Sequence, residues 1–245
     1  MTLREKSILA GLYLSKFDTK GLSALGFSSF KEAYNALGFA IGTKPASLKN
    51  YRDELDPYFP NERQGWHKRQ LRDHCRAILE QFRDADLESL KHMICNFCGD
   101  DFRDMNFQDA SETTTNIDAF AQRIMTGRAA ENYFTKHYQA DPVFYDTEIE
   151  DVTHSGCGYD FKLWTSSNRF FAVEVKGIRE LRGSIAMTDK EFHAAKALKN
   201  SYFLYVVKNF VDTPTPTTVR NPAESNMDFT RTERLVIQVS WRSSI

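Results

Sequence analysis

The sequence lacks an excess of either charge. Its 32 Lys and Arg residues are balanced by 33 Asp and Glu residues, so the formal net charge is -1 and the pI is near 6.6. Such a chain does not attract nucleic acid through general basicity, and any such binding must come from local patches. The sequence also lacks an apolar run of membrane-spanning length, and residues 1–6 lack the apolar segment of a signal peptide. We therefore expect a cytoplasmic protein with no membrane segment.

Motifs for several cofactors are missing as well. The four cysteines include one Cys-x-x-Cys pair, Cys95 and Cys98, without a second pair to complete a zinc site. His74, Cys75 and His92 could add ligands only if their helices converge, so reduced thiols are the better interpretation. The six histidines form no His-x-x-x-His or HNH-like cluster, which argues against a histidine-metal nuclease. No Gly-x-x-x-x-Gly-Lys-Ser/Thr loop occurs, so we expect no ATP-driven step in this chain.

Two segments that alternate with a period of two are present in the second half of the chain. Residues 170–176 place Glu174 and Lys176 on one strand face. Residues 159–164 alternate in the same way, and residues 166–168, Ser-Ser-Asn, supply a turn between the two segments. A hairpin centred on this turn places Asp160 directly across from Glu174, with their Cβ atoms about 5 Å apart.

The opposed carboxylates indicate a metal site. Like charges directly opposite on a sheet destabilise it, and a divalent cation between them relieves the repulsion. Mg²⁺ fits because it takes one or two carboxylates plus substrate phosphate, and we expect Mn²⁺ to substitute. Asp160 and Glu174 are the expected ligands, with the backbone carbonyl of Val175 as a third oxygen. Lys176 would orient or help deprotonate the attacking water. The alternative is an exposed hairpin with solvated acids and a lysine, because acid-x-Lys alone is common by chance.

The residues around this pair resemble the PD-(D/E)xK nuclease signature. Gly158-Tyr159-Asp160, followed by Val173-Glu174-Val175-Lys176-Gly177, is similar to the form found in the NO VEIN C-terminal domain family, which also occurs in bacterial restriction and defence proteins. Residues 127–131, 188–191 and 202–207 match further blocks of that family. Tyr159 stands where the signature has proline, a position that carries no chemistry. The resemblance covers roughly the last half of the chain and implies a restriction-endonuclease-like fold.

The resemblance also implies a further carboxylate. Glu131 lies in the segment that resembles the opening helix of the family, upstream of the strands. It could supply an auxiliary carboxylate near the metal or hold a water. A solvated helix acid is the alternative interpretation.

The chain divides into two parts by its patterns. The first part has apolar residues at three-to-four spacing, which predicts helices at residues 5–17, 29–37, 45–54 and 64–82. Residues 105–116 have the composition of a linker. We therefore predict a helical DNA-binding domain at residues 1–110 and a PD-(D/E)xK nuclease domain at residues 117–245.

The second part is predicted to be α/β, a mixed sheet flanked by helices. A helix is expected at residues 117–137, and the capping box of Thr188 and Glu191 predicts another at 189–199. The continuous apolar run at residues 202–207 predicts a strand buried on both faces. The remaining expected elements are strands at 143–152 and 234–241 and a long loop at 212–227.

Local positive charge in the first part predicts a DNA-binding surface. Residues 61–76 carry more basic than acidic side chains, and a short helix before them adds two more. The candidates are Lys49, Arg52, Arg63, Trp66, Lys68, Arg69 and Arg72. The alternative is a solvated surface in which these arginines pair with nearby acids and Trp66 belongs to the core.

Together these patterns predict a Mg²⁺-dependent endonuclease that cleaves double-stranded DNA, of the restriction or phage-defence kind. Its catalytic residues would be Asp160, Glu174 and Lys176, with Glu131 as the auxiliary candidate. A homodimer is expected, because two-fold symmetry presents one active site to each strand. The alternative is a non-catalytic nucleic-acid or partner-binding module on a nuclease fold, and RNA also stays open as a substrate.

Overall fold

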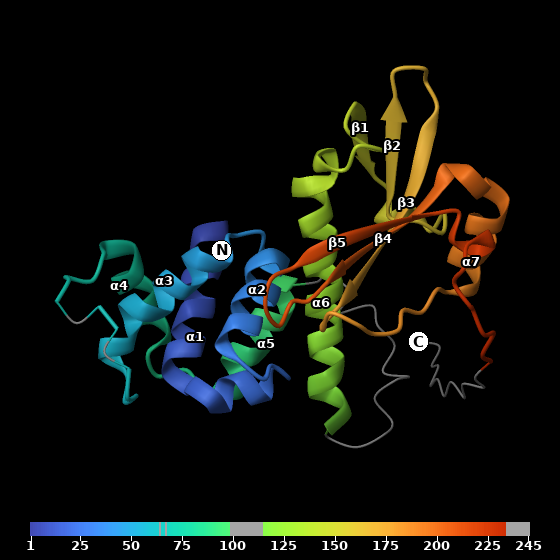
Figure 1. Cartoon of the computed structure of the whole chain (residues 1–245). Coiled ribbons are helices and arrows are strands. Elements are labelled where there is room, and N and C mark those ends of the chain that lie inside the picture. Colours follow the sequence, from blue (N-terminus) through green and yellow to red (C-terminus); the bar gives the residue numbers. More distant parts are fainter. Residues whose placement is uncertain (64, 67, 99–114, 234–245) are drawn as a thin grey trace, which may run out of the picture.

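Amphipathic segments in the first hundred residues form a layer of helices. The computed structural model describes residues 1–63, 65–66, 68–98 and 115–233, and shows this layer beside a sheet, with helix α6 between them (Figure 1). Thr2 and Glu5 form a capping box that starts the first helix, and Ser29 caps the second. The helices of this layer are α1 (Leu3–Ala24), α2 (Phe30–Ile41), α3 (Pro45–Leu55), α4 (Asp73–Phe82) and α5 (Leu87–Cys98).

The helix prediction for residues 64–82 was wrong in its first half. The helix begins only at Asp73, and the segment before it forms turns, among them a 3.0 Å hydrogen bond from the Arg69 amide to the Trp66 carbonyl. The amide of Trp66 donates to the carbonyl of Asp53 at 2.8 Å. A tertiary contact therefore holds this segment against α3. The other three predicted helices are confirmed, although α1 continues beyond residue 17 across a kink at Asp18.

The second half of the chain forms a five-stranded mixed sheet in the order β1-β2-β3-β4-β5. Strands β3 and β4 are parallel and are joined through helix α7 (Asp189–Leu198), while the other neighbouring pairs are antiparallel. The strands are β1 (Thr147–Asp151), β2 (Phe161–Thr165), β3 (Phe170–Ile178), β4 (Tyr202–Lys208) and β5 (Thr215–Arg220). The predicted α/β class, a mixed sheet flanked by helices behind a helical N-terminal region, is confirmed.

The hairpin has the register that the alternation predicted. Phe161 pairs with Val173 and Lys162 with Ala172, and the amide of Asp160 donates to the carbonyl of Val173 at 3.0 Å. The same register carried one step further sets Asp160 across from Glu174. The face of β3 that holds Glu174 is therefore the face toward which Asp160 is directed.

Four predicted elements differ from the structure or lie outside the described residues, in whole or in part. The first strand is shorter than expected, and the long loop predicted at residues 212–227 contains strand β5. Pro216 is accommodated because β5 is the last strand of the described sheet, where a missing N–H need not face a partner. The predicted strand at 234–241, and the linker at 105–116 except its last two residues, lie outside the described residues.

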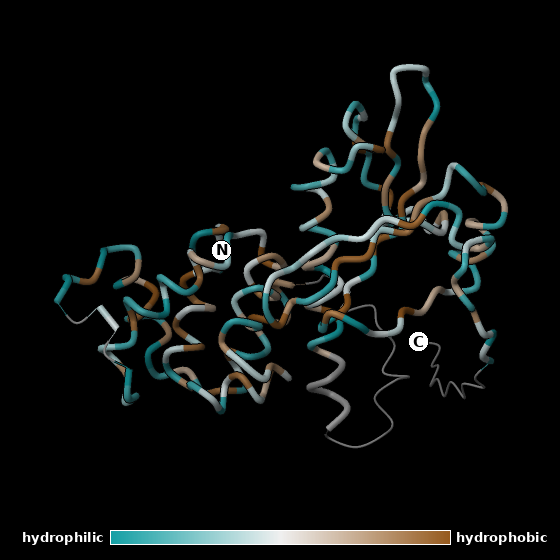
Figure 2. Tube along the Cα trace, in the orientation of Figure 1, coloured by the Kyte–Doolittle hydropathy of each residue, from teal (hydrophilic) through white to brown (hydrophobic). Residues whose placement is uncertain are grey.

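Helix α6 (Thr115–His137) joins the two layers into one core. Ala130 and Phe134 of α6 are fully buried, and the Phe134 ring lies 5.1 Å from that of Phe161 and 4.7 Å from that of Tyr205. On its other side α6 contacts α2, and Asn132 donates to the carbonyl of Phe39 at 3.0 Å. Hydrophobic residues concentrate on the inner strands and on the facing helices (Figure 2). The buried core is thus continuous from α1 to β4.

Candidate active site

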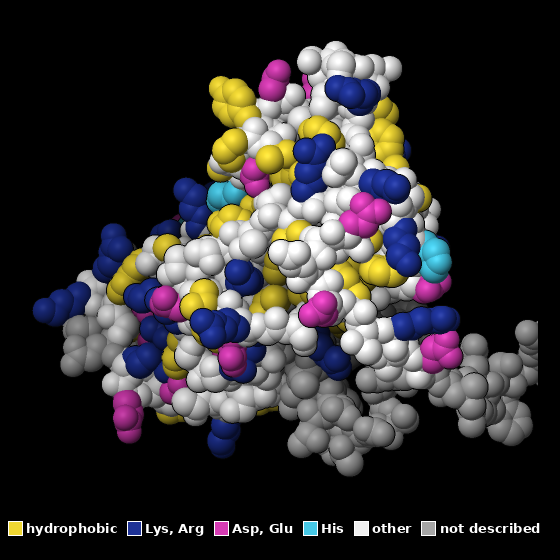
Figure 3. Space-filling view, turned by 45° about the vertical axis from the view of Figure 1, so that its right-hand side comes forward, with side chains coloured by type: hydrophobic (Ala, Val, Ile, Leu, Met, Phe, Trp, Pro, Cys, Tyr) yellow, Lys and Arg dark blue, Asp and Glu magenta, His cyan; other side chains and the backbone are white. Residues whose placement is uncertain are grey.

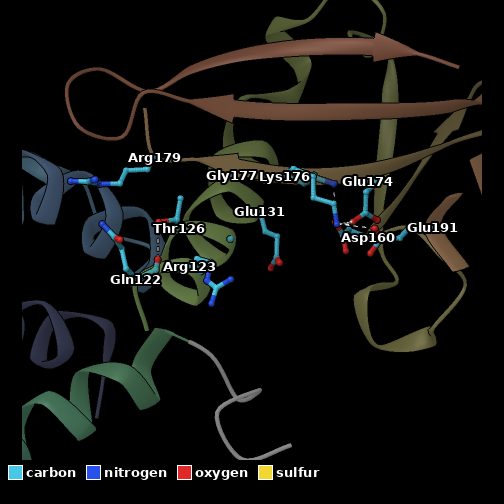
Figure 4. A pocket seen from close by; sticks show the side chains of 12 residues that line it. Gln122, Arg123, Thr126, Glu131, Asp160, Glu174, Lys176, Gly177, Arg179 and Glu191 are labelled. Atoms are coloured by element: carbon cyan, nitrogen blue, oxygen red, sulfur yellow. Dashed lines mark hydrogen bonds and ion pairs between the residues drawn. The ribbon is translucent and has the colours of Figure 1, made fainter. Parts of the chain in front are cut away.

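A cavity of about 450 Å³ lies where α6 passes the end of β3 and the start of α7. Asp160, Glu174, Lys176 and Glu191 gather at one end of it, and Glu131 and Arg123 reach toward it from α6 (Figure 4). The close approach of β3 to α6 depends on Gly177, because a Cβ there would meet the carbonyl oxygen of Thr126 at 2.5 Å. The sequence therefore places a glycine directly after Lys176 for a steric reason.

Asp160 is positioned by the loop that precedes it. Gly158 has a φ of +90°, and a Cβ there would meet the Lys190 carbonyl oxygen at 2.8 Å, so this turn requires glycine. The buried hydroxyl of Tyr202 donates to the Gly158 carbonyl at 3.0 Å and fixes the turn against the sheet. The carboxylate of Asp160 accepts the Val175 amide at 2.8 Å, which directs it toward β3.

Glu174 and Lys176 point to the same side of β3, as predicted. Glu174 is only 3% exposed, and its carboxylate lies 2.6 Å from Nζ of Lys176. The same Nζ lies 2.9 Å from the carboxylate of Glu191. Lys176 is therefore held between two acids at the mouth of the cavity.

Burial and repulsion from neighbouring carboxylates raise the pKa of Asp160 and of Glu174. For Asp160 the largest cause is desolvation, opposed by the Val175 hydrogen bond and reinforced by the charge of Glu131. For Glu174 the causes are desolvation and then the charge of Asp160. Burial alone would lower the pKa of Lys176, but its ion pairs with Glu174 and Glu191 outweigh that effect and raise it. Lys176 is therefore an ammonium group at neutral pH.

Glu191 is a site residue that the sequence prediction missed. Its carboxylate accepts the Thr188 amide at 3.0 Å, and its amide donates to the Thr188 hydroxyl at 3.2 Å, which confirms the predicted capping box. The same carboxylate also binds Lys176. The capping box was the signal in the sequence that could have indicated this role. It places Glu191 in the first turn of the helix that follows β3, where a side chain can face the end of that strand.

Glu131 lies at the cavity, as the resemblance implied, and it also has a local partner. Its carboxylate forms an ion pair of 2.8 Å with Arg128, one turn earlier on α6. Its charge contributes to the raised pKa of Asp160. Glu131 is thus electrostatically coupled to Asp160.

The residues present fit a small hard cation better than zinc. Within the described ranges, no three or more His, Cys, Asp or Glu side chains are grouped so as to hold a metal ion, and Cys95 and Cys98 are buried and form no disulfide there. Asp160 and Glu174 supply two carboxylates whose repulsion a divalent cation would relieve, and Mg²⁺ is commonly held by that number. The carbonyl of Val175 remains the expected third oxygen.

The predicted DNA-binding residues lie away from this cavity, near α3 and α4 at the far side of the helical layer (Figure 1). Four of them are in ion pairs: Lys49 and Arg52 with Asp53 at 2.5 and 2.6 Å, Arg63 with Asp56 at 2.9 Å, and Arg72 with Glu54 at 2.5 Å. Lys68 and Arg69 are exposed, and Arg69 lies over the half-buried Trp66 ring at 5.0 Å. On the face seen in Figure 3, basic side chains are interspersed with acidic ones.

The fold and the cluster together define an α/β domain with a buried acid–acid–lysine site. Residues 128–219 match the family described as Protein NO VEIN, C-terminal, so the resemblance is confirmed for this segment. The match includes Glu131, Asp160, Glu174, Lys176 and Glu191. No curated protein and no solved structure matches the chain. None of the helices in the described ranges has the length and apolar character needed to cross a bilayer.

Proposed function

We propose that this protein is a Mg²⁺-dependent endonuclease that cleaves phosphodiester bonds of double-stranded DNA. The observation that carries the proposal is the convergence of Asp160, directly before β2, with Glu174 and Lys176 of β3 at one end of a cavity. Buried titratable groups with strongly perturbed pKa values gather most often at functional sites. The family match to residues 128–219 is consistent with a restriction or phage-defence role.

The side chains divide the chemistry among them. Asp160 and Glu174 would hold the cation, which when bound would lower the pKa of a water and offset charge on the phosphoryl oxygens. Lys176 is kept protonated by its two acidic partners, so it acts as a hydrogen-bond donor toward the attacking water or a phosphoryl oxygen and does not remove a proton. Glu131 could hold a water at the α6 side of the cavity.

The test is cleavage of varied plasmid and phage DNA, modified and unmodified, with Mg²⁺ or Mn²⁺, followed by sequencing of the ends. Asp160→Ala, Glu174→Ala and Lys176→Ala should each abolish cleavage, while Glu148→Ala, an exposed acid on β1, should leave it unchanged. Wild-type cutting by either Asp160→Ala or Glu174→Ala would refute the site. DNA binding with no cleavage in any metal would instead favour a non-catalytic module, and cleavage of RNA alone would reassign the substrate.

A second surface is proposed for phosphate contacts. Lys68 and Arg69 keep their charges exposed, whereas Arg63 is committed to the buried carboxylate of Asp56. Replacing Arg69 by Ala should reduce the log-log salt slope of DNA binding by about 1 without loss of stability. Arg63→Ala should instead destabilise the fold by about 2–4 kcal/mol, because the buried carboxylate of Asp56 loses its closest cation and keeps Arg52 at the longer distance of 3.7 Å. An unchanged slope in Arg69→Ala and Lys68→Ala would remove DNA binding from this segment.

Assembly follows from the proposed cleavage of both strands. A two-fold homodimer on DNA would present one cavity to each strand. Light scattering of the DNA complex should then give two chains per duplex. One chain per duplex, together with concerted cutting of both strands, would rule the dimer out.

A further inference from the structure

One basic side chain in the cavity beside the acid cluster, Arg123, has no acidic partner among the residues that the structure describes. Lys176 is bound by Glu174 and Glu191, and Arg179 is bound by Glu32 across the layer boundary. Arg123 on α6 lines the same cavity, is exposed, and makes no ion pair or hydrogen bond within the described part of the chain. Figure 4 shows its side chain in the space between Thr126 and Glu131.

The spacing along α6 puts Arg123 on the face that forms one wall of the cavity. Arg123, Gly127 and Glu131 are four residues apart in turn, so they lie one above another on the same side of the helix. A Cβ added at Gly127 would meet nothing within 4 Å, so the wall between the two charged residues is open. Arg123 and Glu131 are separated by about 12 Å along the helix axis.

The acidic lining of the cavity favours a role for Arg123 in binding an anionic substrate. Four acidic side chains line it, Asp160, Glu174, Glu191 and Glu131, together with the basic side chains of Lys176, Arg179 and Arg123. A phosphodiester approaching this end would meet net negative charge, which disfavours binding unless a cation nearby offsets it. An arginine offers a planar fork that binds phosphate oxygens through two parallel hydrogen bonds.

We propose that Arg123 binds a backbone phosphate of the DNA strand that is cut, a few nucleotides from the cleaved bond, across the open wall at Gly127. This inference rests on the proposed nuclease function, since it assigns a substrate contact at the same cavity. Arg123 is a substrate-binding residue in this arrangement and not a catalytic one. It lies outside the segment that matches the family, residues 128–219.

The experiment measures affinity of the full chain for one duplex by fluorescence anisotropy over a range of salt concentrations, in Ca²⁺ so that binding is seen without turnover. Arg123→Ala should weaken binding about tenfold, the value of one hydrogen bond to a charged group, and should lower the log-log salt slope by about 1. Arg123→Lys should keep the slope but recover only part of the affinity, because it retains the charge and loses the fork.

Arg4→Ala is the matched control, because Arg4 is also an exposed helix arginine with no ion pair among the described residues, and it does not line the cavity. It should leave affinity and slope unchanged. An equal affinity and slope for wild type and Arg123→Ala would overturn this inference while leaving the nuclease proposal intact. If wild type neither binds nor cuts DNA, both fail. An unchanged thermal unfolding midpoint in Arg123→Ala excludes a purely structural effect.

Discussion

Replacing Glu174 by Gln should make the metal-free protein more stable while removing its response to Mg²⁺. Glu174 is 3% exposed and faces Asp160, and burial together with that neighbour raises its pKa to about 9, while the pKa of Asp160 rises to about 7. A carboxyl that ionises at higher pH in the folded chain than in the unfolded chain favours unfolding once the unfolded group has ionised. Metal-free stability should therefore fall as the pH rises from about 4 toward about 9.

The raised pKa of Glu174 also gives the expected size of the stability gain. Each pKa unit corresponds to about 1.4 kcal/mol, and local relaxation reduces the full value, so we expect a gain of about 1–3 kcal/mol near neutral pH for Glu174→Gln. The amide oxygen of Gln can still accept a hydrogen bond from Lys176. Lys176 also keeps its 2.9 Å ion pair with Glu191, so the substitution leaves no unpaired cation.

The assay is urea unfolding in chelator and in Mg²⁺, at a mildly acidic and a mildly alkaline pH, for wild type, Glu174→Gln and the exposed control Glu148→Gln. Wild type and Glu148→Gln should lose stability toward alkaline pH in chelator and regain it with Mg²⁺. Glu174→Gln should show a weaker pH dependence and no gain from Mg²⁺. A loss of several kcal/mol in Glu174→Gln would refute the reasoning, because Glu174 would then serve mainly as the structural partner of Lys176.

Three further outcomes are expected. Gly177→Ala should destabilise the fold by about 1–3 kcal/mol in urea unfolding, because its Cβ would press on the Thr126 carbonyl, whereas Gly127→Ala, with open space around it, should be neutral or stabilising by up to about 1 kcal/mol. Burial raises the pKa of Glu32, but hydrogen bonds from Arg179 and Ser28 outweigh that effect and lower the pKa overall. The stability this pair supplies should therefore be present above about pH 4 and be lost as the pH falls further, and Arg179→Ala should flatten that acid limb of the pH–stability curve. Ca²⁺ should support DNA binding with little cleavage, and excess chelator should abolish cleavage, as gel assays would show; activity that persists in chelator would contradict the metal mechanism.

The parts of the site that the sequence predicted are those that depend on the local alternation of side chains. Alternation over residues 159–164 and 170–176, with a turn of fixed length, determines the register and therefore the opposition of Asp160 and Glu174. The capping box that starts α7 was predicted for a similar reason, since it is a contact between residues only three apart in the sequence.

The parts that were not predictable depend on packing between distant segments. Glu191 reaches Lys176 only because α7 returns beside β3, and Arg123 reaches the cavity only because α6 crosses the end of that strand. The basic residues near α3 are visible in the sequence, but the sequence does not show which acids they pair with. Arg63 and Arg72 were therefore predicted to bind phosphate, whereas both form ion pairs with carboxylates. Periodicity reports the face of an element and not what that face meets.

In the proposed mechanism, the two ion-pair partners of Lys176 would let Glu174 bind a cation while the lysine stays in place. In this arrangement Nζ offsets part of the cost of ionising the buried Glu174, whose pKa burial and Asp160 nevertheless keep raised. If Glu174 turned to a divalent cation, Lys176 would lose that partner but would stay within 2.9 Å of Glu191. Because Glu191 is itself fixed by the capping box of α7, the ammonium would remain at the mouth of the cavity and not swing into solvent. Glu191 thus allows Glu174 to exchange partners while Lys176 keeps the position from which it would contact substrate.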